Sequence, residues 1–334
     1  MKRFNCSTAL IAAAAAVLGA LPAAAQEEVT VTLNWTAGGD HAPIYWAQEQ
    51  GWYADAGLDL TIEEGRGSGA AVQSVGVGAV EFGIADMPTV LQGRGEGADV
   101  VAVMALYVNS PYGLYWVRGG DIDTYEDLAG HTIGNPPFDA ARQMWPAIAA
   151  AIGVDPDSVE FVNIAPEAKI ASLQSGVIDA TTHFYNVHYI YERIFGDDLG
   201  FVALRDIGFN PYGNAFIVNG AYMAEHADAV TAFVQTTQRA YAACVADPNP
   251  CVSSLARAAS QDSVDVRANW DLVVELMTDA NAGTLPLGHF DPARMEETYG
   301  FVADSFDIEG YDVTDAYTNE FLDDSVVMPE PPQE

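Results

Sequence analysis

Short apolar runs alternate with longer amphipathic runs through most of the chain. From Val29 the run VTVTLNW is rich in β-branched residues, and the helical run that follows has Pro43 in its first turn and ends at Gly51. The same alternation continues through LDLTIEE, EFGIAD and VVAVMAL. Strands that alternate with helices favour a mainly parallel sheet flanked by helices on both faces.

A second series of the same kind follows the extended stretch NSPYGLYWVRGGD. Its expected strands are HTIGN, VEFVNI, VIDATTHF and FVALRDI, and AARQMWPAIAAAIG is expected as one helix that Pro146 interrupts. From Met223 onward apolar residues such as Val230, Phe233 and Val234 recur at helical spacing. The pattern therefore predicts two similar α/β units and an appended C-terminal helical segment.

The first 25 residues have a different pattern. A basic start, Met1 to Arg3, precedes the apolar run ALIAAAAAVLGALP, and Ala23-Ala24-Ala25 offers small residues for cleavage. The run is short and alanine-rich for a membrane span, although an uncleaved anchor is the alternative. We therefore predict a signal peptide over residues 1–25 and a periplasmic protein without a membrane anchor.

Removal of 25 of the 334 residues leaves a chain that is longer than one hydrophobic core usually fills. The repeated α/β pattern predicts two lobes, with the late segment returning to the first one. Two hinge crossings are expected, near Asn109–Tyr115 and Gly208–Ala215. The predicted boundaries are 26–110 plus 215–334 for lobe 1, and 111–214 for lobe 2.

The charge composition limits the kinds of molecule that this protein is expected to bind. Thirteen basic residues stand against 47 acidic ones, a formal net charge of −34. Nucleic acid is excluded, because phosphate binding needs a basic surface. A solvated acidic surface explains the charge, and it leaves an anionic ligand open because exposed charges are screened within about 1 nm.

Two cysteines follow the predicted leader. Cys244 and Cys251 bracket VADPNP, whose prolines and asparagine favour a turn. In an oxidising compartment we expect a small disulfide loop, and two buried free thiols are the alternative.

Several motifs in order carry a family resemblance. LNWTAGGDHAPIYWAQEQGWYADAGLDL, GRGSGAAVQSVGVGAVEFGIAD, YEDLAGHTIGNP and EAKIASLQSGVIDAT resemble the family of periplasmic thiamine-pyrimidine-precursor, sulfonate, nitrate and taurine binding proteins. The resemblance implies the type II periplasmic-binding-protein fold, in which two lobes close on a small-molecule solute. It also implies a monomer that delivers this solute to the transmembrane subunits of an ABC transporter.

Polar and aromatic residues cluster at the expected strand ends, where open α/β sheets bind ligands. Each of them is open to a structural interpretation, as a strand terminator or a core residue. Trp35, Asp86 and His183 are the leading expected contacts. The full candidate set is Asn34, Trp35, Asp40, His41, Ser68, Asp86, Tyr112, Asn135, Thr182, His183, Phe184, Tyr185 and Tyr212.

Three of these residue types suggest particular contacts. Trp35 is suited to stacking on a flat ring. Asp40 and Asp86 are suited to an amino group or a cation, although Asp also precedes proline-started helices in DHAP and DMP. Gly67-Ser68-Gly69 at a helix start is suited to an anion, although an ordinary loop is the favoured interpretation of such a turn.

The ligand itself is less determined. NW…DHAPIY resembles the thiamine-precursor branch most, so a thiamine-related aminopyrimidine is the first choice. THFYNVHY and NPYGNAF contain no acidic residue, whereas a precursor binder is expected to have one among its second-lobe contacts. A taurine-like sulfonate or another small organic solute therefore stays open.

An enzyme is the alternative of another class. The fungal pyrimidine synthase of the same superfamily uses a histidine and pyridoxal phosphate and carries a cysteine-rich iron motif, and His41 matches that histidine only approximately. This chain has no such cysteine cluster, and G-x-S-x-G, H-E-x-x-H and P-loop patterns are absent from it. His183 and His188 are one residue too far apart to share a metal across a helix turn. We expect no catalytic residues, no metal and no cofactor.

Overall fold

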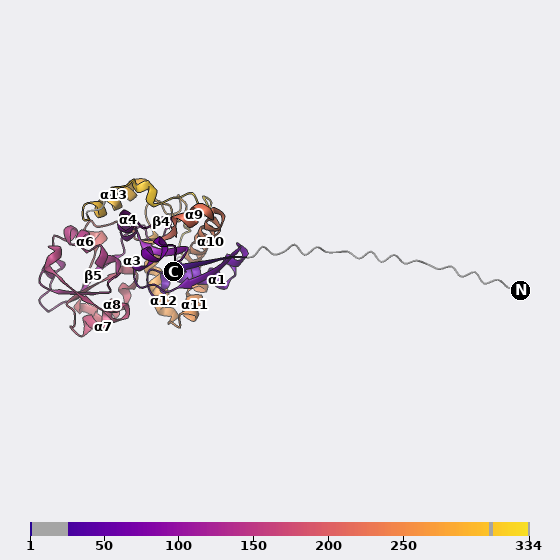
Figure 1. Ribbon diagram of the computed structural model, residues 1–334. Helices are drawn as coiled ribbons and strands as arrows, with labels where there is room; N and C mark the ends of the chain where they lie inside the picture. Colours follow the sequence, from indigo (N-terminus) through magenta and orange to yellow (C-terminus); the bar gives the residue numbers. More distant parts are fainter. Residues whose placement is uncertain (2–25, 307–309, 333–334) are drawn as a thin grey trace.

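The computed structural model describes residues 26–306 and 310–332, together with Met1. The predicted signal peptide lies outside these residues apart from Met1, so it stays a prediction. The described chain forms two α/β lobes that lie side by side in Figure 1. Each lobe is built on one five-stranded sheet.

The sheet of the first lobe combines strands from both ends of the chain. Its order is β2-β1-β3-β10-β4, and β10 is antiparallel to both of its neighbours while the other strands share one direction. β4 is apolar and buried along its whole length, as expected for a strand that is covered on both faces. Its strands are β1 (Glu27–Thr32), β2 (Leu58–Glu63), β3 (Phe82–Asp86), β4 (Val100–Ala105) and β10 (Asn214–Asn219).

The sheet of the second lobe repeats this plan. Its order is β7-β6-β8-β5-β9, and here β5 is the one antiparallel strand. The predicted α/β class is confirmed, with one reversed strand in each otherwise parallel sheet. The strands are β5 (Tyr112–Val117), β6 (Thr132–Asn135), β7 (Glu160–Asn163), β8 (Ala180–Phe184) and β9 (Leu199–Ala203).

The helices fall into three groups along the chain. In the first lobe they are η1 (Gly39–His41), α1 (Ala42–Glu49), α2 (Trp52–Asp55), α3 (Ser68–Gly76) and α4 (Met87–Gly95). In the second they are η2 (Tyr125–Leu128), α5 (Ala140–Gln143), α6 (Trp145–Ile152), η3 (Pro156–Ser158), η4 (Pro166–Ala168), α7 (Lys169–Gln174), η5 (Tyr185–Val187), α8 (His188–Phe195), η6 (Gly196–Asp198) and η7 (Leu204–Ile207). The C-terminal group is α9 (Gly220–Glu225), α10 (Ala227–Ala246), α11 (Pro248–Ala258), α12 (Ser263–Met277), α13 (Pro292–Ala303) and η8 (Val313–Ala316).

One predicted helix is two. The segment expected as a single helix interrupted by Pro146 is α5 followed by α6, and Pro146 lies in the first turn of α6. Proline lacks an amide proton and is tolerated there, since the first-turn amides have no partner within the helix.

The two segments that join the lobes lie side by side. The amide of Tyr107 donates to the carbonyl of Asn214 at 2.9 Å, and the amide of Gly213 donates back to Tyr107 at 2.9 Å. The amide of Ser110 donates to the side chain of Asn210 at 2.7 Å. These bonds tie the two crossings together.

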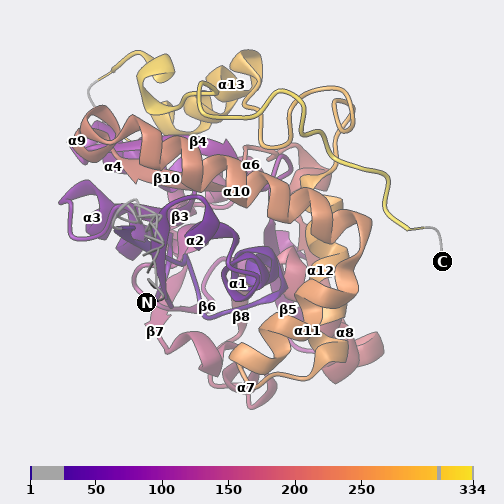
Figure 2. The ribbon, with the colours of Figure 1, turned by 90° about the vertical axis from the view of Figure 1, so that its right-hand side faces the viewer.

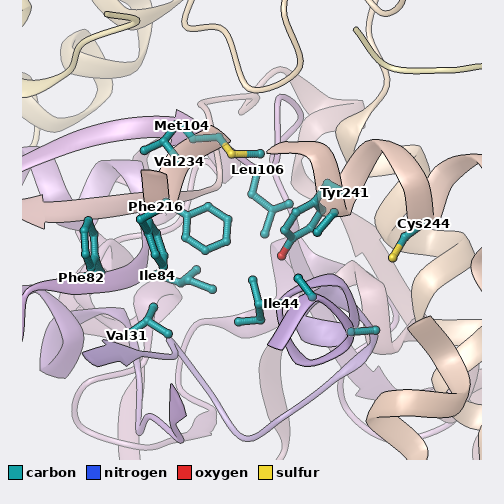
Figure 3. Close-up of a cluster of buried hydrophobic side chains, with 14 of the residues drawn as sticks. Val31, Ile44, Phe82, Ile84, Met104, Leu106, Phe216, Val234, Tyr241 and Cys244 are labelled. Carbon is teal, nitrogen blue, oxygen red and sulfur yellow. The ribbon is translucent and has the colours of Figure 1, made fainter. Parts of the chain in front are cut away.

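The C-terminal helices cover the first sheet. In Figure 2, α10, α11 and α12 follow one another around α1, and α1 contacts both α10 and α11. Figure 3 shows Phe82, Phe216 and Tyr241 in the core that this arrangement buries. Cys244 and Cys251 are joined by a disulfide between α10 and α11, so the predicted disulfide is confirmed. Among the described helices, none has the length and apolar character needed to cross a membrane.

Candidate functional site

A cavity of about 370 Å³ is lined by both lobes. The first lobe contributes the loop after β1, the start of α3, and α12 with the loop before it. The second lobe contributes the start of α5, η4, and the end of β8 with the residues that follow. Eight of the predicted candidates are among the lining residues: Asn34, Trp35, Asp40, His41, Ser68, Thr182, His183 and Phe184.

His41 is held by hydrogen bonds inside the first lobe. The Gly38 amide donates to His41 Nδ1 at 3.0 Å, and Nε2 lies 3.1 Å from the Asn34 side-chain oxygen. Because Nδ1 accepts, the ring proton is on Nε2 and is donated to Asn34. Burial lowers the pKa of His41, against the opposing charges of Asp40 and Glu64. His41 is therefore a neutral residue that positions Asn34.

The Asp40 carboxylate lies beside this network and is only 4% exposed. Tyr107 donates its hydroxyl to Oδ2 at 3.0 Å. Oδ1 lies 3.3 Å from His41 Nδ1, which has no proton to donate because it accepts the Gly38 amide. Asp40 lines the cavity, and its Oδ1 therefore lacks a donor from these neighbours.

Trp35 extends from the first lobe to the second. Lys169 Nζ lies 4.9 Å from the centroid of its indole, within the range of a cation–π contact. The same Nζ donates to Asp139 Oδ2 at 2.6 Å and to the Thr182 carbonyl at 2.8 Å. His183 meets the indole edge-on, with ring centroids 6.0 Å apart. The second lobe thus fixes the indole while part of the ring lines the cavity.

The positive charge of Lys169 is compensated by Asp139 within the second lobe. Its side chain is buried, and it pairs with Asp139. Burial lowers the pKa of Lys169, and the Asp139 carboxylate opposes that shift. Burial and then the charge of Lys169 lower the pKa of His183 well below its usual value, so His183 is neutral. Its Nδ1 lies 3.1 Å from the Tyr191 hydroxyl.

The glycine-rich turn before α3 does not offer an open anion site. The Gly69 amide donates to the Phe138 carbonyl of the second lobe at 3.3 Å, and Ser68 Oγ accepts the Asp86 amide at 3.0 Å. Gly67 has φ 131°, and a Cβ there would collide with the Phe138 carbonyl. The turn is therefore a close contact between the lobes, and the Gly69 amide is not available to an anion.

Asp86, a leading predicted contact, does not line the cavity. It is fully buried and caps α4, with its Oδ2 accepting from the Thr89 amide at 3.5 Å. The Tyr112 hydroxyl of the second lobe also donates to Oδ2. Burial raises the pKa of Asp86 to about 7, and the hydrogen bonds from Tyr112 and Thr89 oppose that shift. The helix-cap interpretation is the one the structure favours.

The other candidates that miss the cavity have structural partners. Tyr112 is fully buried against Phe184 and Asp86. Asn135 donates to Thr182 Oγ1 at 2.6 Å inside the second lobe. Tyr185 packs under Arg205, with the guanidinium carbon 4.1 Å from the ring centroid. Tyr212 accepts the Asp291 amide at 2.9 Å near the crossings.

Several lining residues were not among the predicted candidates. They are acidic or amide side chains: Asp139, Glu167, Asn186, Gln261, Asp262, Asp265 and Asn269. Asp139 and Glu167 supply the second-lobe carboxylates that THFYNVHY and NPYGNAF lack. Asp139 follows the end of β6, so its presence at the ligand site was predictable from the tendency of α/β sheets to bind ligands beyond their strand ends. The α12 residues had no such signal.

Besides the contacts of Trp35, two side-chain hydrogen-bonding contacts join the lobes beside the cavity. Arg193 of α8 pairs with both carboxylate oxygens of Asp265, at 2.6 and 3.3 Å. Asn186 Nδ2 donates to Asn269 Oδ1 at 3.3 Å. The walls of the cavity therefore depend on how closely the lobes approach. In the part of the chain that the structure describes, no three His, Cys, Asp or Glu side chains gather as a metal site.

Comparison with known proteins identifies the family to which this chain belongs. A family model described as NMT1/THI5 like matches residues 39–250, more than half of the chain. The chain belongs to the NMT1/THI5-like family.

Relatives of this NMT1/THI5-like chain carry two kinds of name. The formylaminopyrimidine-binding protein of Halalkalibacterium halodurans is 28% identical over 255 residues, 75% of each chain. The 4-amino-5-hydroxymethyl-2-methylpyrimidine phosphate synthase of Legionella pneumophila is 24% identical over 308 residues, 90% of this chain and 94% of that one. The alkanesulfonate-binding protein SsuA of Xanthomonas axonopodis, solved with MOPS, has a TM-score of 0.67 at 15% identity and covers 89% and 99% of the two chains. This likeness shows that the NMT1/THI5-like chain has the periplasmic-binding-protein fold.

Proposed function

We propose that this protein is the periplasmic solute-binding component of an ABC importer, and that it captures a thiamine-related aminopyrimidine between its lobes. The observation that carries the proposal is the cavity lined by both lobes, with Trp35 as one wall and Asn34 and Asp40 beside it. A volume of about 370 Å³ suits a single-ring solute with a short substituent. The relative named as a formylaminopyrimidine-binding protein supports the same ligand class.

The polar groups match an aminopyrimidine. A flat heteroaromatic ring stacks on an indole, and its exocyclic amine needs an acceptor. Asp40 Oδ1 supplies an acceptor, and Asn34 supplies an amide that His41 holds in place. A ligand that contacts both Trp35 and the second-lobe residue Phe184 stabilises the closed lobes, because it favours that state over the open one.

A sulfonate fits this cavity less well. Sulfonates need amides or free cations, and the Gly69 amide and the Lys169 ammonium are already engaged by Phe138 and Asp139. The two lining histidines, His41 and His183, have lowered pKa values and carry no charge at neutral pH. The sulfonate alternative therefore ranks below the aminopyrimidine.

A pyridoxal-phosphate enzyme of the synthase type also fits poorly. Such cofactors need a lysine amine and a cradle for the phosphate. The sequence has one lysine after the predicted leader, Lys169, and it is buried in the pair with Asp139. The amide of the turn before α3 is likewise taken by Phe138. We therefore propose a binding protein and derive no catalytic step.

Calorimetry on residues 26–334 tests the proposal. We expect 4-amino-5-hydroxymethyl-2-methylpyrimidine to bind with a micromolar or lower Kd, and taurine and nitrate to show no heat. Small-angle scattering with and without the pyrimidine is expected to show a ligand-dependent compaction. Binding of taurine alone would exclude the pyrimidine assignment.

The enzyme alternative has a separate measurement. Pyridoxal phosphate is added to residues 26–334, followed by borohydride and peptide mass spectrometry. We expect no pyridoxyl adduct on Lys169, because its ammonium is buried and paired. An adduct there, formed at stoichiometric cofactor, would support an enzyme of the synthase type.

A further inference from the structure

The charges around the cavity are unbalanced. Five carboxylates line it, from Asp40, Asp139, Glu167, Asp262 and Asp265. Within the part of the chain that the structure describes, the basic side chains recorded in ion pairs with these carboxylates are Lys169, Arg193 and the uncharged His41.

Lys169 and Arg193 are already engaged by these carboxylates. Arg142 lies within electrostatic reach of Asp139 and donates to the Asn135 carbonyl and to Asn163 Oδ1. Lys169 pairs with Asp139, and Arg193 pairs with Asp265 at 2.6 Å and lies within electrostatic reach of Asp262. Asp40 and Glu167 have no recorded ion pair with a lysine or arginine side chain. The cavity therefore has an excess of negative charge.

Asp40 is the most consequential of these carboxylates, because it is buried. A carboxylate removed from water is costly unless a cation or hydrogen-bond donors compensate it. Oδ2 receives the Tyr107 hydroxyl, whereas the nearest neighbour of Oδ1, His41 Nδ1, accepts a hydrogen bond from Gly38. A positively charged hydrogen-bond donor on the ligand would supply the missing partner of Asp40 Oδ1 and would neutralise the carboxylate charge.

Aromatic groups stand near the same carboxylates. Trp35, Phe184 and Tyr189 line the cavity. Aromatic faces attract organic cations, and the attraction grows when the cation is removed from water. The Trp35 ring already accepts one such contact from Lys169 at 4.9 Å.

We propose that the cavity selects a cationic solute, an aminopyrimidine whose side chain carries a protonated amine placed on Asp40, and that it rejects the phosphorylated form. This inference rests on the proposed function and specifies the charge of its ligand. Glu167, which is exposed at the cavity, adds to the attraction from the second lobe. A phosphate ester would bring negative charge toward these carboxylates, and Lys169 and Arg193 are already paired with two of them.

Three ligands that share one pyrimidine ring and differ in the charge of one substituent test this inference. They are 4-amino-2-methylpyrimidines whose 5-substituent is aminomethyl, hydroxymethyl or phosphorylated hydroxymethyl, so the substituent is positive, neutral or negative at pH 7. We expect calorimetry on residues 26–334 to give a Kd for the amine about tenfold or more below that of the alcohol. The phosphate ester is expected to bind at least about tenfold more weakly than the alcohol.

The outcomes separate the two proposals. If the alcohol or the phosphate ester binds as tightly as the amine, the charge inference is wrong while the proposed pyrimidine binding stands. If none of the three probes binds, the proposed function is wrong and the inference falls with it.

Substitutions in the protein test which carboxylate causes the preference for the amine. Asp40→Asn keeps an acceptor for Tyr107 and removes the charge, so the preference for the amine over the alcohol is expected to fall to about threefold or less. Glu167→Gln, an exposed change that is safe for folding, is expected to reduce the preference by about twofold at low salt and by less at high salt. Asp59→Asn removes the same charge from an exposed position on β2 and is the matched control. A preference that survives unchanged in both Asp40→Asn and Glu167→Gln would overturn the inference.

Discussion

Replacement of Trp35 by alanine is the most direct test of the candidate site. The indole is half-buried, lines the cavity, and contacts Lys169 and His183 across the boundary between the lobes. Alanine removes both the surface for the ligand and the contacts to the second lobe. The change therefore affects affinity directly and, through lobe closure, indirectly.

The magnitude follows from these contacts. Stacking of a heterocyclic base on an aromatic side chain contributes about 1–3 kcal/mol as measured by alanine substitution. Loss of about 2 kcal/mol raises Kd roughly 30-fold. The cation–π contact with Lys169 contributes about 0.5–2 kcal/mol, and it stabilises the closed lobes with or without ligand. We therefore expect Kd to rise between tenfold and a few hundredfold.

Titration calorimetry with 4-amino-5-hydroxymethyl-2-methylpyrimidine measures this effect. Trp35→Phe is the control, because it keeps an aromatic face and is expected to lose less than about tenfold in affinity. Urea denaturation checks that Trp35→Ala is folded. A folded Trp35→Ala protein with unchanged Kd would refute the stacking role and remove Trp35 from the site.

Three further predictions address closure, pH and the disulfide. Gly67→Ala is expected to weaken ligand binding about tenfold or more and to increase the radius of gyration with ligand, because its Cβ collides with the other lobe. Asp86 has its pKa raised to about 7, so its contribution to stability is present below pH 4 and is lost as pH rises to about 7, by roughly 4 kcal/mol at most. Asp86→Asn is expected to remove this part of the pH dependence in urea denaturation. Replacement of Cys244 and Cys251 by alanine opens a loop with a sequence separation of 7 and is expected to cost about 2 kcal/mol of stability.

Each of these has a discriminating control. Gly130→Ala also places alanine at positive φ, 86°, but its Cβ meets no atom within 4 Å, so equal loss of binding in both variants would contradict the closure argument. For Asp86→Asn, the stability difference from the parent is measured at pH 5 and pH 8. A constant difference would show that Asp86 does not titrate in this range. For the cysteine pair, a reducing agent is expected to destabilise the parent protein alone.

The sequence by itself determined the layers of this protein and the ends of its strands. Alternation of apolar runs with amphipathic runs is local information, and it predicted strands such as VVAVMAL, which forms β4. The turn-forming residues between Cys244 and Cys251, together with the predicted oxidising compartment, led to the expected disulfide that the structure contains. Trp35 follows the end of β1 and His183 lies near the end of β8, and both line the cavity, where the ends of parallel strands meet.

Only the tertiary structure decided which of these edge residues line the cavity. Asp86 ends β3 and Trp35 follows β1 in the same sheet. β10 pairs beside β3 and Tyr112 donates to the Asp86 carboxylate, so this carboxylate is buried away from the cavity. Asp262 and Asp265 reach the cavity because α12 packs against η1 and η5, elements far away in the sequence. Side-chain contacts between lobes depend on long-range packing, which a local pattern of apolar and polar residues does not encode.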